Sequence, residues 1–208
     1  LLGMFHGMRE NEICQLLIDD IVCVDGTPCL YIRIEEHNNQ SIKNDSSWRI
    51  FPVHMTLLQF GFLNYVNQRR TERDKIAKSR KSTVAEKQRQ KQLFQFMTQS
   101  SGRRSYIKNF LNFYTKFNRQ ITTTPGKTFH SLRHNFSSAL NNTSRIPYAV
   151  SYLDGHSFRT ETDRTYTKPD FAVLQQELSR LDYGFNLFEV FGTTPLSDEE
   201  INRQKEQL

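Results

Sequence analysis

The sequence predicts a mainly α-helical protein with a small antiparallel β-sheet, an α+β fold. Apolar residues recur at three- and four-residue steps in several segments, as they do on the buried face of a helix. Alternation of apolar and polar residues is confined to two short runs, at 29–35 and 48–53. The 208 residues are 37% hydrophobic. They contain no apolar run of about 18 residues, which argues against a membrane span.

The N-terminal quarter holds the expected sheet. A helix is predicted over 9–17, followed by a turn at 25–28, where Asp, Gly and Pro favour reversal of the chain. Strands over 29–35 and 48–53 then form a hairpin, and the long polar segment between them is its tip. Pro52 places the end of the second strand at a sheet edge, because proline cannot donate to a neighbouring strand.

The rest of the chain is predicted to contain helices over 55–66, 106–117, 145–153 and 169–183. A further helix, which carries His130 and Arg133, is predicted after a break at 123–126. We interpret the aromatic stripe on 106–117 as core and not as a platform for base stacking. Ser197 and Glu200 have the spacing of a capping box, which predicts a short final helix.

Positive charge gathers in one segment. The whole chain has a net charge of +6. The segment from Arg69 to Lys91 contains ten Lys or Arg residues and three acidic residues, so its net charge is +7. The rest of the chain therefore has a net charge of −1. Such a segment can neutralise phosphates of a nucleic acid; the alternative is a solvated helix or loop without a partner. The candidate DNA-binding residues are Arg69, Arg70, Arg73, Lys75, Lys78, Arg80 and Lys81.

Neither a disulfide framework nor a metal site is indicated. Cys14, Cys23 and Cys29 are few and unevenly spaced, which favours buried free thiols. His130 and His134 are four residues apart, but no third ligand follows in a usual pattern, so no metal is expected.

A different chemistry fits the polar motifs. His130 and Arg133, three residues apart on a helix, share one face. A guanidinium presents a planar fork of donors that matches phosphate oxygens, and Arg9 could hold the same phosphate from another helix. Two arginines would stabilise a pentavalent transition state. Tyr166 lies in a polar stretch as a candidate nucleophile, and its pKa near 10 means that it needs a base or cationic neighbours.

The order of these motifs resembles the tyrosine recombinase (phage integrase) family across residues 1–168. The matching segments are Gly7-Met8-Arg9-Glu10-Asn11-Glu12, Ile42-Lys43-Asn44, His130-Ser131-Leu132-Arg133-His134-Asn135-Phe136, Leu153-Asp154-Gly155-His156 and Tyr166. One departure is the step of ten residues from His156 to Tyr166, where nine is commoner in the family. The resemblance implies the catalytic-domain fold of these recombinases, with residues 1–183 as the catalytic domain and 184–208 as a tail.

The resemblance also implies a role for each motif residue. Tyr166 would attack the scissile phosphate and form a 3′-phosphotyrosyl link, while Arg9 and Arg133 hold the non-bridging oxygens. His130 would take part in proton transfer, and His156 would hydrogen-bond the phosphate. Lys43 would protonate the leaving 5′-oxygen, and Glu12 would support Arg9. The family needs neither metal nor ATP, so no cofactor is expected.

Double-stranded DNA is the implied partner, bound by a homotetramer that can be monomeric without DNA, with accessory DNA-bending proteins, in the bacterial cytoplasm or nucleoid. The family's separate N-terminal core-binding domain is expected to be missing from this chain. The segment from 169 to the C-terminus could dock on a neighbouring protomer or pack in cis. Integration or excision of a prophage or mobile element is the expected activity; the alternatives are strand relaxation of the type IB topoisomerase kind and a DNA-binding module without catalysis.

Overall fold

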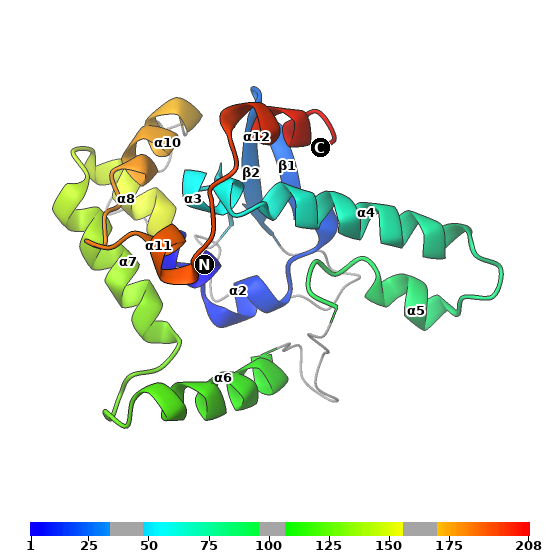
Figure 1. Cartoon of the computed structure of the whole chain (residues 1–208), viewed down its shortest axis with the longest axis horizontal. Helices are drawn as coiled ribbons and strands as arrows, with labels where there is room; N and C mark the ends of the chain where they lie inside the picture. Colours follow the sequence, from blue (N-terminus) through cyan, green and yellow to red (C-terminus); the bar gives the residue numbers. More distant parts are fainter. Residues whose placement is uncertain (34–47, 96–106, 156–169) are drawn as a thin grey trace.

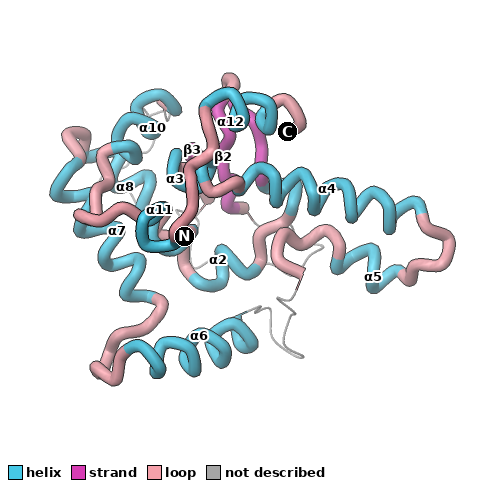
Figure 2. The backbone as a smooth tube through the Cα atoms, viewed as in Figure 1, coloured by secondary structure: helices cyan, strands magenta, loops and turns pink. Residues whose placement is uncertain are grey.

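The computed structural model describes residues 1–33, 48–95, 107–155 and 170–208. In this part of the chain, helices surround a three-stranded antiparallel sheet of order β1-β2-β3 (Figures 1 and 2). The predicted α+β class is confirmed.

The sheet begins with a tight hairpin of β1 (Ile21–Val24) and β2 (Thr27–Ile32). Asp25 and Gly26 form its two-residue loop, and both have positive φ, at 48° and 74°. This is the loop chemistry whose twist matches that of antiparallel strands. The sequence analysis identified the turn but assigned no strand before it, so β1 was missed.

The one hairpin predicted from the sequence is confirmed as the second hairpin of the sheet. β2 pairs antiparallel with β3 (Arg49–Pro52), with Leu30 opposite Phe51 and Ile32 opposite Arg49. Among the described residues β3 pairs with β2 alone, so Pro52 lies on an edge strand there, as expected. The tip of the hairpin, residues 34–47, lies outside the described residues.

The first predicted helix is shorter than expected. After α1 (Leu2–Phe5), α2 runs only over Glu10–Cys14, and a 3-10 turn, η1, follows at Ile18–Asp20. The backbone N–H of Leu17 donates to Asp20 Oδ2 at 2.8 Å, which starts the new turn. This side-chain bond replaces the continuation of the helix that the apolar spacing predicted.

Two helices replace the one predicted over 55–66. α3 (Met55–Gln59) ends before Gly61, whose φ of 80° breaks the helix, and α4 continues over Phe62–Lys78. α4 and α5 (Val84–Arg89) form a helical hairpin that projects from the body (Figure 1). The basic segment is therefore ordered helix over most of its length.

The helices that follow agree with the predicted ones within a few residues: α6 (Ile107–Ile121), α7 (His130–Thr143), α8 (Pro147–Asp154) and α10 (Phe171–Ser179). α7 packs on α1 and α8, and α10 packs on β3. The motif helices are thereby gathered around the N-terminal segment.

The C-terminal tail packs in cis. The rings of Phe60 and Phe188, the latter from α11 (Leu187–Phe191), stack with centroids 4.3 Å apart. Leu196 N donates to Gln59 O at 3.0 Å, just before α12 (Asp198–Lys205) contacts α4. The predicted capping box at the start of α12 is confirmed.

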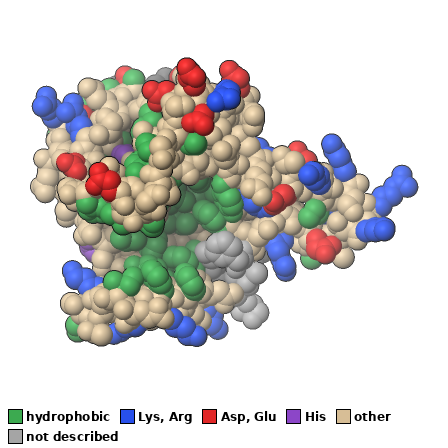
Figure 3. Space-filling model, viewed as in Figure 1, with side chains coloured by type: hydrophobic (Ala, Val, Ile, Leu, Met, Phe, Trp, Pro, Cys, Tyr) green, Lys and Arg blue, Asp and Glu red, His purple; other side chains and the backbone are tan. Residues whose placement is uncertain are grey.

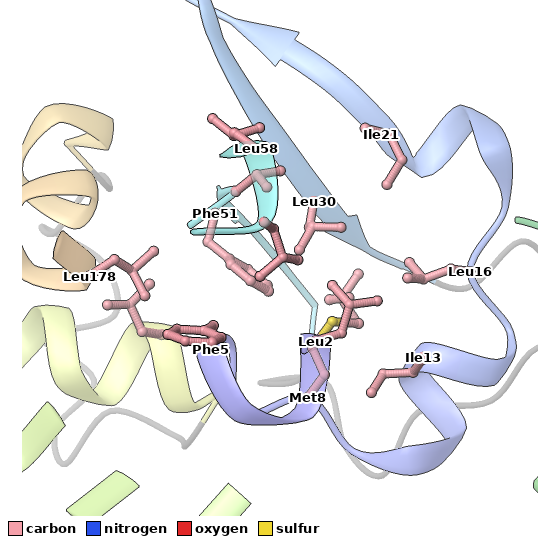
Figure 4. Packing of buried hydrophobic residues seen from close by; sticks show 14 of the residues in the cluster. Leu2, Phe5, Met8, Ile13, Leu16, Ile21, Leu30, Phe51, Leu58 and Leu178 are labelled. Carbon is pink, nitrogen blue, oxygen red and sulfur yellow. The ribbon is translucent and has the colours of Figure 1, made fainter. Parts of the chain in front are cut away.

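One core joins the N-terminal segment, the sheet and α10 (Figure 4). Phe5 and Met8 from the N-terminal segment, Phe51 from β3 and Leu178 from α10 are all within this cluster and almost fully buried. The site motifs flank these residues, so the core fixes their positions.

The aromatic stripe of α6 was predicted to be core, and this is confirmed in part: Phe110 and Tyr114 pack against the core, whereas Phe113 and Phe117 do not. Phe110 and Tyr114 pack edge-on against Phe129 with centroids 5.0 and 5.1 Å apart, but Phe113 and Phe117 are 66% and 49% exposed. α6 touches the body along one edge only, beside an apolar cavity of about 760 Å³ bordered by α1, α4 and α6. Figure 3 shows this apolar surface in a hollow of the molecule.

Candidate active site

Arg9 and Glu12 are joined at the start of α2. Arg9 is the N-cap, and its backbone N–H donates to Glu12 Oε2 at 2.9 Å. Its side-chain Nη1 also donates to Glu12 Oε1, at 2.7 Å. Because the acidic residue three positions into the helix accepts both bonds, the Gly-x-Arg-x-x-Glu spacing holds the guanidinium in one place.

Arg133 ties two distant segments to α7. Its guanidinium donates to the carbonyl oxygens of Gly7 and Asp154 and lies 3.8 Å from the Asp154 carboxylate. Ser137 Oγ donates to the same carboxylate at 2.7 Å. Gly7 is two residues before Arg9, and Asp154 is two residues before the predicted His156, so this one buried side chain connects three motifs.

A third arginine, Arg49 of β3, was missed by the sequence analysis. Its Nη1 and Nη2 lie 3.4 and 3.3 Å from the two oxygens of Glu12, and its side chain is 1% exposed. The available signal was an arginine in a short apolar strand next to Pro52, a place where a charge needs a buried partner.

The site is electropositive. Arg9, Arg49 and Arg133 face two carboxylates, Glu12 and Asp154, so the five side chains sum to +1. Burial acts to raise the pKa of Glu12, but Arg49 and Arg9 outweigh it and hold that pKa below its ordinary value. Burial lowers the pKa of Arg133, helped by neighbouring Arg9 and Arg49 and opposed by Asp154. The planar donor forks of guanidinium groups match the geometry of phosphate oxygens.

His130 begins α7 one turn before Arg133 and is exposed. Its ring contacts that of His134 edge-on, with centroids 4.8 Å apart. The structure thus gives His130 access to solvent beside the buried arginine.

Three predicted catalytic residues, Lys43, His156 and Tyr166, lie outside the described residues and stay predictions. Gly155, which directly precedes His156 in the sequence, is the C-cap of α8 and has a φ of 62°. Tyr152, the other tyrosine near this motif, donates from its hydroxyl to Ile50 O at 2.9 Å. Burial raises the pKa of Tyr152, so its hydroxyl serves the fold.

The seven predicted DNA-binding residues divide by environment. Arg69 is 3% exposed and donates to the carbonyl oxygens of Leu93 and Gln92. These bonds hold the segment that follows α5 against α4. Arg70 donates to Leu208 O and Ile21 O, and Arg73 pairs with Asp19 at 2.6 Å. Lys75, Lys78, Arg80 and Lys81 are exposed toward the far end of the hairpin, where Figure 3 shows basic side chains.

A second basic feature is visible in the sequence but was missed. Asp and Glu are absent from the whole stretch between Glu86 and Asp154. This stretch includes α6, whose Lys108, Lys116 and Arg119 are exposed. Exposed basic side chains on a helix that itself carries no acidic residue would attract a polyanion.

Cysteine and metal chemistry find no support among the described residues. Cys14, Cys23 and Cys29 are free, and burial raises the pKa of Cys14 and of Cys29 to about 12. Cys23 is exposed, which corrects the expectation that all three are buried. Within residues 1–33, 48–95, 107–155 and 170–208, no three His, Cys, Asp or Glu side chains gather as a metal site would require.

Comparison with protein families identifies the chain. A sequence model of the phage integrase family matches residues 1–172, which include Arg9, Glu12, Arg49, His130 and Arg133. The chain belongs to the phage integrase family. Its membership makes it a site-specific tyrosine recombinase and a DNA-binding strand transferase in general terms. This integrase matches no curated protein and no solved structure. In the described part of the integrase, no helix is long and apolar enough to cross a membrane.

Proposed function

We propose that this chain cleaves and rejoins double-stranded DNA through a 3′-phosphotyrosyl intermediate, for integration or excision of a prophage or mobile element. The observation that carries the proposal is the position of Arg133, whose guanidinium binds the carbonyls of Gly7 and Asp154 and so connects the segments of Arg9 and His156. This arrangement supports two arginines facing one phosphate.

The proposed reaction exchanges one phosphodiester for another. Tyr166 Oη forms a bond to phosphorus while the bond from phosphorus to the 5′-oxygen breaks, and the tyrosyl proton leaves toward His130. Lys43 gives a proton to the departing 5′-oxygen. Arg9 and Arg133 stabilise the negative charge on the non-bridging oxygens as the pentavalent state forms. Attack by a 5′-hydroxyl on the phosphotyrosine reverses the steps, so ligation needs no ATP and no further cofactor.

DNA binding is proposed to use the exposed part of the basic segment. Lys75, Lys78, Arg80 and Lys81 would contact phosphates, whereas Arg69 belongs to the internal hydrogen-bond network of the hairpin. Assembly into a tetramer on DNA, help from DNA-bending proteins and a bacterial cytoplasmic location remain proposals that follow from the same reaction.

A covalent-trapping experiment tests the proposal. The protein is incubated with a pool of random-sequence nicked duplexes and then denatured. Protein that is covalently linked to DNA is recovered, and the attached DNA is sequenced. A nick beside the cleavage site lets the short released strand diffuse away, so the covalent intermediate accumulates. We expect adducts on a restricted set of sequences with the wild-type chain and none with Tyr166→Phe.

Three results would contradict the proposal in different ways. Adducts of equal yield with Tyr166→Phe would assign the nucleophile elsewhere. Tight binding of the pool without any adduct would identify a DNA-binding module without catalysis. A topoisomerase-like activity would be favoured if the protein relaxed a supercoiled plasmid carrying the recovered sequence but did not transfer the trapped strand to a second duplex.

A further inference from the structure

We propose that Arg49 is a positioning residue of the strand-cleavage site, which keeps Glu12 from neutralising Arg9 and fixes the end of α8. This inference rests on the proposed strand-transfer reaction. Arg49 is not among the residues that the family motifs brought to attention, and its role follows from its contacts.

The first contact is with Glu12. The two Nη atoms of Arg49 lie 3.4 and 3.3 Å from Oε1 and Oε2, so the guanidinium faces both oxygens of the carboxylate. Arg9 binds Oε1 through Nη1 at 2.7 Å. Glu12 is therefore shared between two arginines from separate elements, α2 and β3.

Burial separates the roles of these two arginines. The side chain of Arg49 is 1% exposed, whereas that of Arg9 is 16% exposed. We therefore place Arg9, the more exposed of the two, at the DNA phosphate and Arg49 behind Glu12. Arg49 consequently acts through Glu12 and not on the substrate.

Charge shows why the third arginine matters. Arg9 with Glu12 alone sums to zero, and addition of Arg49 brings the group to +1. In a buried site this difference is felt strongly, because little water screens it. Without Arg49, the carboxylate would balance the charge that Arg9 must present to a phosphate.

The second contact is with the end of α8. A Cβ atom on Gly155 would lie 2.6 Å from Arg49 Nη1 and 2.8 Å from Cζ, so only glycine allows the guanidinium to lie against this backbone. The neighbouring hydroxyl of Tyr152 donates to Ile50 O, which holds β3 and α8 together. A cation at a helix C-terminus is favourable, and the next residue along the chain is His156.

The test uses Arg49→Met, Arg49→Lys and the double variant Arg49→Met with Glu12→Gln. The probe is a nicked duplex recovered from the random pool with the wild-type chain. Single-turnover adduct formation at saturating DNA, DNA affinity and thermal unfolding are measured for each. Arg33→Met is the matched control, because Arg33 pairs with Asp20 at 2.7 Å on the same hairpin but outside the site.

We expect Arg49→Met to slow adduct formation by about 100-fold, the effect of a misplaced catalytic group. DNA affinity should change little, Arg49→Lys should be intermediate, and Arg33→Met should react as the wild type does. The decisive result is a sign change. Glu12→Gln should slow the wild-type chain but accelerate Arg49→Met, since it removes the carboxylate that neutralises Arg9. Loss of packing alone cannot produce such a reversal.

Two outcomes would overturn the role of Arg49. One is wild-type adduct formation by a folded Arg49→Met variant, and the other is further loss of rate when Glu12→Gln is added to it. If the protein forms no adduct with DNA at all, the contact between Arg49 and Glu12 can still be tested by a measurement that needs no DNA. The Glu12 carboxyl carbon is titrated by NMR in the folded wild-type and Arg49→Met chains.

The carboxylate of Glu12 faces Arg9 and Arg49, with Arg133 and Asp154 nearby. Loss of the Arg49 guanidinium should raise the pKa of Glu12, and an unchanged pKa would refute the contact. A raised pKa together with a wild-type chain that forms no adduct would support the contact and reject only the proposed reaction.

Discussion

The ring of Phe136 lies so close to Gly7 that a Cβ atom on Gly7 would stand 2.3 Å from Cδ1 of the ring. Gly7 has a φ of 57°, and its carbonyl accepts from Arg133. The glycine of the Gly-x-Arg motif and the phenylalanine of the His-x-x-Arg-His-x-Phe motif are therefore one packing unit. It brings Arg133 close to the segment that carries Arg9.

Gly7→Ala should consequently destabilise the protein and disturb Arg133. The alanine would add a steric clash to a backbone conformation that disfavours side chains, with a cost of about 3 kcal/mol or more. Urea unfolding measures this loss in the free energy of unfolding. Gly126→Ala is the control, because Gly126 has a φ of 79° and nothing within 4 Å of the added Cβ. Equal destabilisation of the two variants would mean that the contact with Phe136 contributes nothing.

Tyr152→Phe separates the structural tyrosine from the proposed nucleophile. It removes the hydroxyl that donates to Ile50 O at 2.9 Å and accepts from Ile50 N at 3.2 Å, so both backbone groups of this half-buried residue lose that partner. We expect a loss of about 1–2 kcal/mol in the free energy of unfolding, with covalent attachment to DNA preserved. Trapping with the recovered duplex checks this, and loss of the adduct in a folded Tyr152→Phe variant would transfer the catalytic role to Tyr152.

Stability should fall between pH 6.5 and pH 4 because of the buried His54. Burial lowers its pKa from 6.5 to about 4, and burial also lowers the pKa of its neighbour His6. The unfolded chain binds protons in this window and the folded chain does not, so stability is fully present above 6.5 and is lost as the pH falls. For His54 the loss approaches about 3 kcal/mol.

Urea unfolding at about pH 7.5 and about pH 5.5 measures the effect, since carboxylates with lowered pKa titrate below this range. His54→Asn should flatten the dependence while preserving the cap, because an asparagine oxygen can accept from Thr56 N as His54 Nδ1 does at 3.1 Å. A slope as steep in His54→Asn as in the wild type would exclude His54 as its source.

DNA affinity should depend on salt through the exposed residues of the α4–α5 hairpin. Replacement of Lys75, Lys78, Arg80 and Lys81 by Gln should lower the slope of log affinity against log salt by about 0.9 for each phosphate that the variant no longer neutralises. Arg69→Gln should instead destabilise the hairpin, because Arg69 is 3% exposed and bonded to Leu93 O. A slope unaffected by the four replacements would mean that the hairpin does not touch DNA.

Much of the fold was predictable because its signals are local. The β2–β3 hairpin and the α12 capping box follow from residue types at fixed spacing, as does the apolar face of α10. The pattern failed where a single polar bond or glycine overrides it. Asp20 ends the helical run after α2, and Gly61 divides α3 from α4.

The site was predictable only where motif residues are close in sequence. The Arg9–Glu12 pair is set by helix geometry and is confirmed as a contact. Arg49 is 37 residues from Glu12, and only the folded sheet brings them together. In the same way, the charge run could not reveal that Arg69 faces inward, because burial depends on how α5 folds back on α4.

Tyr166 is proposed to form the covalent bond to DNA. The most direct measurement is peptide mass spectrometry of the trapped adduct after nuclease digestion, with the released strand assayed for a free 5′-hydroxyl. We expect a nucleotide joined through its 3′-phosphate to Tyr166 and a released 5′-hydroxyl end. A nucleotide on any other residue, or a released end that carries a 5′-phosphate, would contradict this proposal.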